Sequence, residues 1–168
     1  MFNDLQTLCL VIVLAPLAGA LLAGLGGGIL GRAGAHTVTI LGVLVATICS
    51  FVVFKQVIVD GMPPADFTVY EWLSSGNFSL QVGFLIDPLT VTMMSVVTFV
   101  SLMIHVYTIG YMHDDPGYTR FFSYISLFTF AMLMLVMANN FMQLFFGWEA
   151  VGVVSYLLIG FWYQRESA

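Results

Sequence analysis

The feature that most limits how this chain can fold is a set of long apolar runs almost free of charge. Residues 5–31, 37–54, 88–112 and 121–138 contain no Asp, Glu, Lys or Arg, and residues 141–163 contain only Glu149. A helix needs about 20 mostly apolar residues to cross roughly 30 Å of hydrocarbon. Only 8% of all residues are charged, whereas a soluble domain carries about a quarter. The sequence therefore predicts an integral membrane protein with about five transmembrane helices.

The predicted fold is an all-α membrane domain over residues 1–168, with helices at about 5–31, 37–58, 88–112, 121–138 and 141–163. The third helix has a clear start, because Asp87 can cap it and Pro88 fits its first position. The first run opens with Asp4 and without a basic residue, unlike a signal peptide. We interpret it as a retained helix.

Residues 66–86, between the second and third helices, have a different pattern. Residues 78–86 alternate apolar and polar side chains with period two, as in a strand, and residues 67–73 are rich in β-forming residues. Ser74, Ser75, Gly76 and Asn77 form a turn signal between them. We predict a short extramembrane β-hairpin, which either covers helix ends or docks a neighbouring subunit.

The few basic residues predict an orientation. Arg32, Arg120 and Arg165 follow the first, third and fifth spans, so all three fall at one end of an alternating bundle. The positive-inside rule places that end in the cytoplasm or mitochondrial matrix, with the N-terminus and the hairpin outside. The net charge of −5 and the absence of a basic patch argue against a nucleic-acid partner.

Glu149 is the strongest candidate for a functional residue. It lies near the middle of the last run, where a charge is costly and an acidic residue is functional by default. Gly152, Tyr156 and Gly160 continue its helical face, and glycines let another helix approach closely. We predict that Glu149 faces protein and exchanges protons; the alternative is a buried carboxyl that only hydrogen-bonds a neighbouring helix.

His105 is a second candidate, in the third span. Its helical face includes Thr98, Ser101 and Thr108, and such a polar stripe must face the bundle or water. A histidine there could pass protons, but the interpretation we favour is a packing residue with one fixed hydrogen bond. The sequence contains no haem-attachment motif, nucleotide fingerprint or metal-ligand pattern.

The residues around Glu149 resemble a known family. Residues 147–162 read GWEAVGVVSYLLIGFW, similar to the fifth-helix signature of the largest antiporter-like subunit of respiratory complex I (bacterial chain L, mitochondrial subunit 5). Residues 87–90, 104–107, 110–112 and 118–122 are similar to the family's third helix and the loop after it. Pro88 departs from the pattern, in which glycine is expected. The resemblance is patchy over the first 60 residues, and its Trp-Glu core recurs in Mrp-type sodium/proton antiporter subunits.

The resemblance implies a proton-translocating membrane-arm subunit of NADH:quinone oxidoreductase, driven by quinone reduction elsewhere in the complex. It implies that Glu149 belongs to a chain of buried ionisable groups and pairs with a lysine on a later helix. No cofactor or metal is expected in this chain; FMN, iron–sulfur clusters and quinone are expected in other subunits. The implied partners are other membrane-arm subunits and the lipid bilayer, in a bacterial inner membrane or, alternatively, a mitochondrial inner membrane.

Two other functions remain open from the sequence. One is a subunit of an Mrp-type sodium/proton antiporter. The other is a truncated structural subunit without transport, because members of the family continue for many more helices. For the same reason we expect the 168 residues to be an N-terminal fragment.

Overall fold

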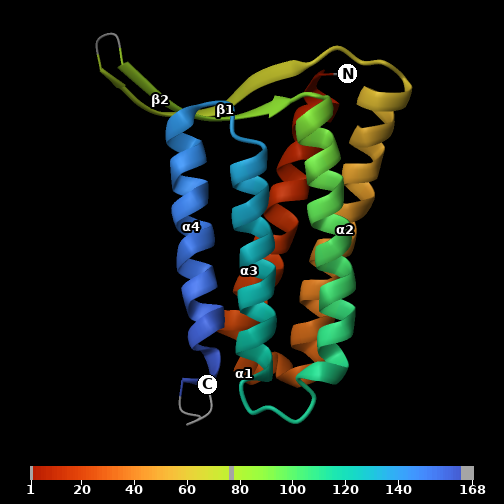
Figure 1. Ribbon diagram of the computed structural model, residues 1–168, viewed down its shortest axis with the longest axis vertical. Coiled ribbons are helices and arrows are strands. Elements are labelled where there is room, and N and C mark those ends of the chain that lie inside the picture. Colours follow the sequence, from red (N-terminus) through yellow and green to blue (C-terminus); the bar gives the residue numbers. More distant parts are fainter. Residues whose placement is uncertain (1, 76–77, 164–168) are drawn as a thin grey trace.

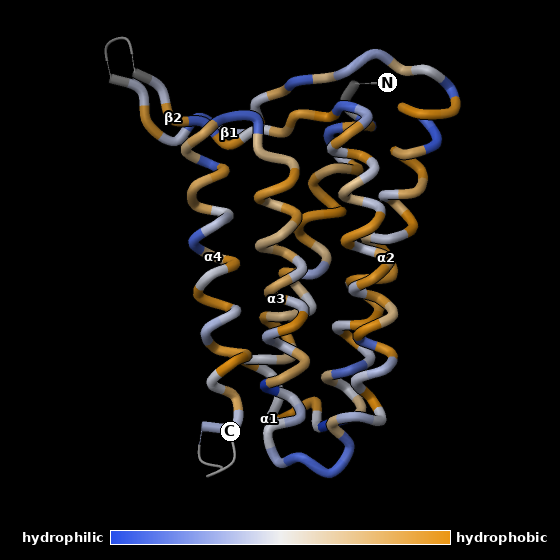
Figure 2. Tube along the Cα trace, viewed as in Figure 1, coloured by the Kyte–Doolittle hydropathy of each residue, from blue (hydrophilic) through white to orange (hydrophobic). Residues whose placement is uncertain are grey.

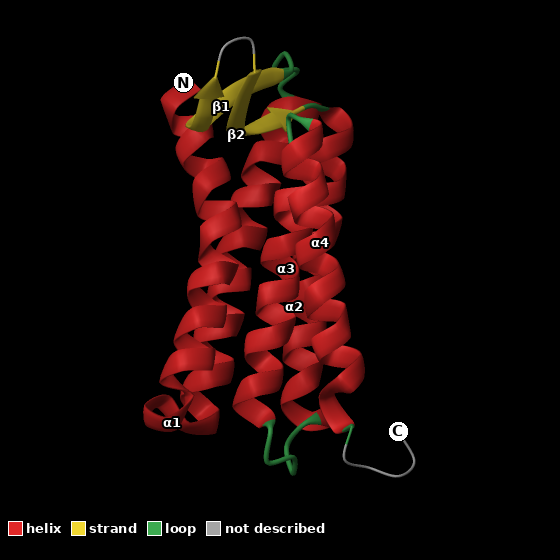
Figure 3. Cartoon of the chain, turned by 90° about the vertical axis from the view of Figure 1, so that its left-hand side faces the viewer, coloured by secondary structure: helices red, strands yellow, loops and turns green. Residues whose placement is uncertain are grey.

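The structure, a computed structural model, describes residues 2–75 and 78–163 and consists of a helical bundle with a two-stranded sheet at one end (Figures 1 and 3). This confirms the predicted class. Its elements in order are α1 (Phe2–Phe54), the π-helical turn η1 (Lys55–Val59), β1 (Ala65–Ser75), β2 (Phe78–Ile86), α2 (Pro88–Tyr111), α3 (Tyr118–Val136), α4 (Phe141–Ile159) and the 3₁₀ turn η2 (Gly160–Trp162).

The long helix α1 is a helical hairpin. A straight helix of 53 residues would be about 80 Å long, yet a Cβ added at Gly42 would lie 2.6 Å from the carbonyl oxygen of Ala15. The chain reverses at Gly31, whose φ is 64°, a conformation that glycine adopts without strain. The two halves meet at one end of the bundle (Figure 1). Among the described residues, the two halves of α1 together with α2, α3 and α4 therefore make five helical segments long enough to span a membrane. Residues 32–36, predicted as a loop, are helical.

The other helices lie close to their predicted ranges. Asp87 caps α2 as expected: its Oδ1 accepts a hydrogen bond from the Thr90 amide at 2.7 Å, and Pro88 follows it. Helix α3 begins at Tyr118, three residues before the charge-free run, because an interfacial arginine does not interrupt a helix. Asn140 caps α4, accepting from the Gln143 amide at 2.9 Å.

Helix α3 lies at the centre of the bundle and packs against α1, α2 and α4. Two of its hydroxyl groups reach the backbone of α1: Ser126 Oγ donates to the Pro16 carbonyl and Ser123 Oγ to the Ala20 carbonyl, both at 2.8 Å. Helix α4 lies at the edge of the bundle, beside α3 (Figure 1). One face of α3 is therefore fixed to α1, and another supports α4.

The β-hairpin lies at its predicted place, but it is irregular, and Ser74 and Ser75, predicted in the turn, belong to β1. Its strands pair antiparallel with register shifts between Thr68 and Tyr70 and between Glu71 and Leu73, which are β-bulges or similar irregularities. Its free end projects past α4 (Figure 1). The Leu85 amide donates to the Met137 carbonyl at 3.0 Å, so β2 is fixed to the connection between α3 and α4.

The polar residues gather at the two ends of the bundle (Figure 2). Arg32 donates to the carbonyl oxygens of His113, at 2.6 Å, and Asp115, at 3.2 Å, so the Gly31 turn lies beside the loop between α2 and α3. We call this end, which also carries Arg120, the inner end, and the end with the hairpin the outer end. Arg32 and Arg120 thus share one end as predicted, whereas Arg165 lies outside the described residues.

Candidate functional site

Glu149 lies near the middle of α4, on the side of the helix that faces away from the bundle. Its side chain is exposed, and together with Phe141, Leu144, Phe145 and Trp148 it lines a shallow hollow. Four of these five residues are apolar. The carboxyl group thus lies about halfway along a membrane-spanning helix, among apolar side chains. No other part of the described chain covers this face of α4.

The predicted helix contact on the Glu149 face is not made by the described residues. Gly152 and Gly160 are exposed, and a Cβ added to either would meet no atom within 4 Å. The close approach is on another face, at Gly147, where an added Cβ would lie 2.8 Å from Leu135 Cα of α3. That Glu149 faces protein stays a prediction, because residues 2–75 and 78–163 do not cover it.

His105 has the opposite environment. Its side chain is completely buried between α2 and α3, and its Nδ1 lies 2.8 Å from the carbonyl oxygen of Ser101. Ser101 Oγ lies 3.3 Å from the same nitrogen and 2.5 Å from Thr129 Oγ1 of α3. The hydrogen bond to the Ser101 carbonyl is the one fixed bond that the packing interpretation of His105 requires. It lies within a small polar cluster inside an apolar bundle.

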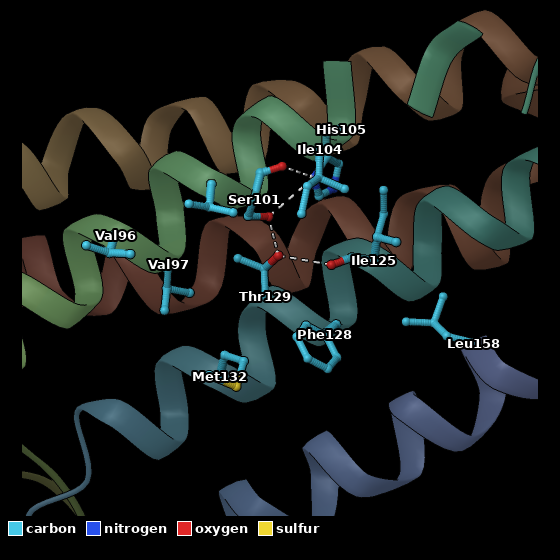
Figure 4. A pocket seen from close by; sticks show the side chains of 11 residues that line it. Val96, Val97, Ser101, Ile104, His105, Ile125, Phe128, Thr129, Met132 and Leu158 are labelled. Carbon is cyan, nitrogen blue, oxygen red and sulfur yellow. Dashed lines mark hydrogen bonds between the residues drawn. The ribbon is translucent and has the colours of Figure 1, made fainter. Parts of the chain in front are cut away.

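The structure does not bring the two predicted site residues together. Glu149 lies on the open face of α4, whereas His105 lies at the bottom of a separate half-open pocket between α2 and α3 (Figure 4). Thr98 and Thr108, on the same helical face as His105, are also inaccessible, so this face meets the bundle, one of the two environments predicted for it. The two residues therefore represent two distinct sites.

Sequence reasoning missed the partner of this cluster on α3. Thr129 is the last of four hydroxyl residues at helical spacing on that helix, and the others are Thr119, Ser123 and Ser126. Such a stripe indicates a face directed towards other helices. Another missed pair is His36 and Tyr118, whose Nδ1 and hydroxyl lie 3.0 Å apart near the inner end.

The loop of residues 113–118, rich in ligand-type side chains, has a structural role. Asp115 Oδ1 accepts from the Gly117 amide and its Oδ2 from Trp162 Nε1, both at 2.7 Å. The carboxylate thereby orders the start of α3 and holds the end of α4 beside the loop. No group of three or more potential metal ligands occurs among the residues that the structure describes.

Comparison with known proteins identifies the family. The chain matches two family models: "NADH-Ubiquinone oxidoreductase (complex I), chain 5 N-terminus" over residues 72–122 and "NADH:quinone oxidoreductase/Mrp antiporter, TM" over residues 138–168. It is 63% identical over 167 residues to NADH-quinone oxidoreductase subunit L of Neisseria meningitidis serogroup B. The chain belongs to the subunit L/chain 5 family. The second match contains Glu149.

Further relatives in this family are bacterial and eukaryotic. NADH-quinone oxidoreductase subunit L of Rickettsia conorii is 42% identical over 97% of the chain, and NADH-ubiquinone oxidoreductase chain 5 of Chondrus crispus is 46% identical over 95% of it. The chain spans 24–25% of the length of these relatives and of the Neisseria subunit. Together with its apolar spans, this makes it a membrane protein of a family found in bacteria and in eukaryotic complex I.

Proposed function

We propose that this chain is part of a proton-translocating membrane-arm subunit of NADH:quinone oxidoreductase, and that Glu149 binds and releases the proton. The observation that carries the proposal is the position of Glu149: the single acidic residue of α4, at half-depth, on the one face of that helix that the described bundle leaves open. An acidic residue turned to hydrocarbon would be costly. A carboxyl kept there has a function or a partner.

The described residues 2–75 and 78–163 leave this face of α4 open, and we assign its cover to a helix outside them. Large apolar side chains surround Glu149, with Trp148 67% and Tyr156 75% exposed. Gly152 and Gly160 would allow a helix to approach closely beside the carboxyl. The greater length of the relatives supports a cover by further helices, and a basic residue on one of them would stabilise the ionised form of Glu149.

The hairpin supports a place within a larger assembly. Tyr70, Trp72 and Leu73 of β1 are each more than half exposed, and the sheet extends beyond α4 (Figure 1). Exposed aromatic residues on a projecting element suit contact with a protein partner. We assign that role to a neighbouring membrane-arm subunit, and place FMN, iron–sulfur clusters and quinone in other subunits.

The orientation follows from the charges at the two ends. Arg32 and Arg120 lie at the inner end, so the positive-inside rule directs that end to the cytoplasm and the N-terminus and hairpin outside. A bacterial cell membrane is the location that agrees with the 63% identity to a bacterial relative.

A second function is favoured by one observation. The family model that matches residues 138–168 covers both NADH:quinone oxidoreductases and Mrp antiporters. A sodium/proton antiporter would therefore use the same glutamate. A sodium gradient would then drive proton movement in vesicles that lack NADH. NADH-driven movement without a sodium requirement supports the oxidoreductase instead.

The test is NADH-driven proton uptake by inverted vesicles that contain the full-length subunit with Glu149→Gln, assayed beside Glu149→Asp. Glutamine keeps the size and hydrogen bonding of the side chain but cannot carry a proton, so we expect proton uptake to fall roughly ten-fold or more in the assembled complex. Aspartate retains a carboxyl group and should preserve part of the rate. Parental NADH oxidation and proton uptake in Glu149→Gln would make Glu149 a packing residue and would refute the proposal.

A further inference from the structure

The β-hairpin extends over the open side of α4. Helix α4 meets α3 at Gly147, where an added Cβ would lie 2.8 Å from Leu135 Cα. Glu149 follows Gly147 by two residues, a rotation of about 200° around the helix, so it points away from α3. The sheet crosses the outer end of α4 and extends beyond it on the side away from α3 (Figure 1). The projecting part of the sheet and Glu149 therefore lie on the same side of α4.

Trp72 of β1 connects the sheet to α4. Its ring centroid lies 5.9 Å from that of Phe146. Phe146 is three residues before Glu149, about 4.5 Å along the helix axis. Trp72 is 61% exposed and Phe146 is 48% exposed, so much of both residues stays uncovered beside their contact. The sheet and the outer half of α4 form two sides of one corner, and Trp72 lies where they meet.

The α4 side of this corner is apolar except for Glu149. Phe141 is 83% exposed, and Phe145 and Trp148 are exposed as well. These three residues, with Leu144 and Glu149, line a hollow of about 320 Å³. Exposed apolar surface that continues over two elements indicates an interaction site. A side chain of a helix packed along α4 could fill the hollow.

A protein helix suits this corner better than lipid chains. The Glu149 carboxyl group would be costly against hydrocarbon, whereas a helix can bring a polar group to it. Gly152, one turn further along α4, meets no described atom within 4 Å of an added Cβ, so a helix backbone can approach there. The chain spans 25% of the length of the Neisseria subunit. A subunit of that length has further helices that can take this place.

We propose that the corner between the sheet and α4 holds the outer end of one transmembrane helix of the full-length subunit. This helix lies beside Glu149, is apolar where it faces Phe145 and Trp148, and ends below Trp72, whose ring contacts its outermost turn. The proposal rests on the proposed function in one respect, the cover of Glu149 by a further helix. It concerns the Trp72 contact alone and leaves Tyr70 and Leu73 of the same strand to a neighbouring subunit.

The test is photo-cross-linking from single positions of the full-length subunit in the assembled complex. The photoreactive amino acid benzoylphenylalanine (Bpa) is introduced as Trp72→Bpa or as Phe145→Bpa, both at exposed aromatic positions. Tyr107→Bpa is the control, because Tyr107 is an exposed aromatic residue of α2 near the inner end. After irradiation, mass spectrometry identifies the peptides or lipids that are linked to each position.

We expect Trp72→Bpa and Phe145→Bpa to cross-link to the outer half of one and the same transmembrane helix of the subunit, and Tyr107→Bpa not to reach that segment. Phe146→Bpa, on the other side of the ring contact, replaces Trp72→Bpa if that variant does not assemble. Lipid adducts alone, no adduct, links to two different helices, or links to another subunit would each overturn the proposal.

This test can fail independently of the proposed function. Its readout is the identity of the linked partner, with Glu149 intact, and it measures no proton movement. Lipid adducts at positions 72 and 145 would overturn the helix in the corner even if Glu149→Gln abolishes proton uptake. A common helix at both positions would support it even if Glu149→Gln pumps at the parental rate.

Discussion

The contact between α3 and α4 at Gly147 yields a prediction of defined size. A Cβ added at Gly147 would lie 2.8 Å from Leu135 Cα and 2.9 Å from its backbone nitrogen. Carbon atoms in good contact are about 3.5–4.0 Å apart, so Gly147→Ala must separate the two helices by roughly 1 Å. Overpacking of this kind costs about 1–3 kcal/mol. The neighbouring atoms belong to backbone, so they cannot rotate away.

Gly152→Ala is the matched control on the same helix, because an added Cβ there meets no described atom within 4 Å. Both substitutions gain up to about 1 kcal/mol of helix propensity. We therefore expect Gly147→Ala to be less stable than Gly152→Ala by about 1–3 kcal/mol. The measurement is the apparent free energy of unfolding of the chain in mild detergent, titrated with SDS and followed by tryptophan fluorescence. Equal stability of the variants, within about 0.5 kcal/mol, would refute the close approach of α3 and α4.

Two further predictions concern the ends of α4. Asn140→Ala should destabilise the chain by about 1–2 kcal/mol, because it removes the cap. Asn140→Asp should keep the cap and lose the two hydrogen bonds that Asn140 Nδ2 donates, to the Gln81 carbonyl and to Asn139 Oδ1, both at 2.8 Å. An Asn140→Asp variant as unstable as Asn140→Ala would contradict this. Trp162→Phe should lower the free energy of unfolding by about 1.5–3 kcal/mol, because it removes the hydrogen bond to the Asp115 carboxylate. The control Trp148→Phe, at an exposed position, should change the free energy of unfolding little. Both are measured by the same SDS titration, and equal losses of stability in the two variants would contradict the prediction.

The spans could be predicted from the sequence because the hydrocarbon thickness sets a minimum length that charge-free runs meet directly. The start of α2 was also predictable, since Asp87 and Pro88 have local roles that do not depend on other helices. The reversal at Gly31 was not. Residues 26–28 are glycines as well, and nothing in the local sequence tells which of them takes a positive φ, so the turn was predicted to be too long.

The site was predictable only in part, for a related reason. A lone acid in an apolar run identifies Glu149 without knowledge of any contact, and the stripe on α2 shows which face of His105 is buried. The approach of Thr129 to Ser101 depends on the register between α2 and α3, which no single-helix pattern contains. What covers Glu149 is likewise a property of contacts between helices, and the described helices do not supply it.

The attachment of the sheet to α4 has a mechanical consequence. The Gly83 amide donates to Gln143 Oε1 at 2.9 Å, and Asn140 binds the Gln81 carbonyl, so β2 holds the first turn of α4 at two points. Glu149 follows Gln143 by six residues, about 9 Å along a stiff helix. Sheet and helix therefore shift together along the membrane normal. A protein that binds the sheet would fix the depth of the carboxyl group in the bilayer, and with it the polarity of its surroundings.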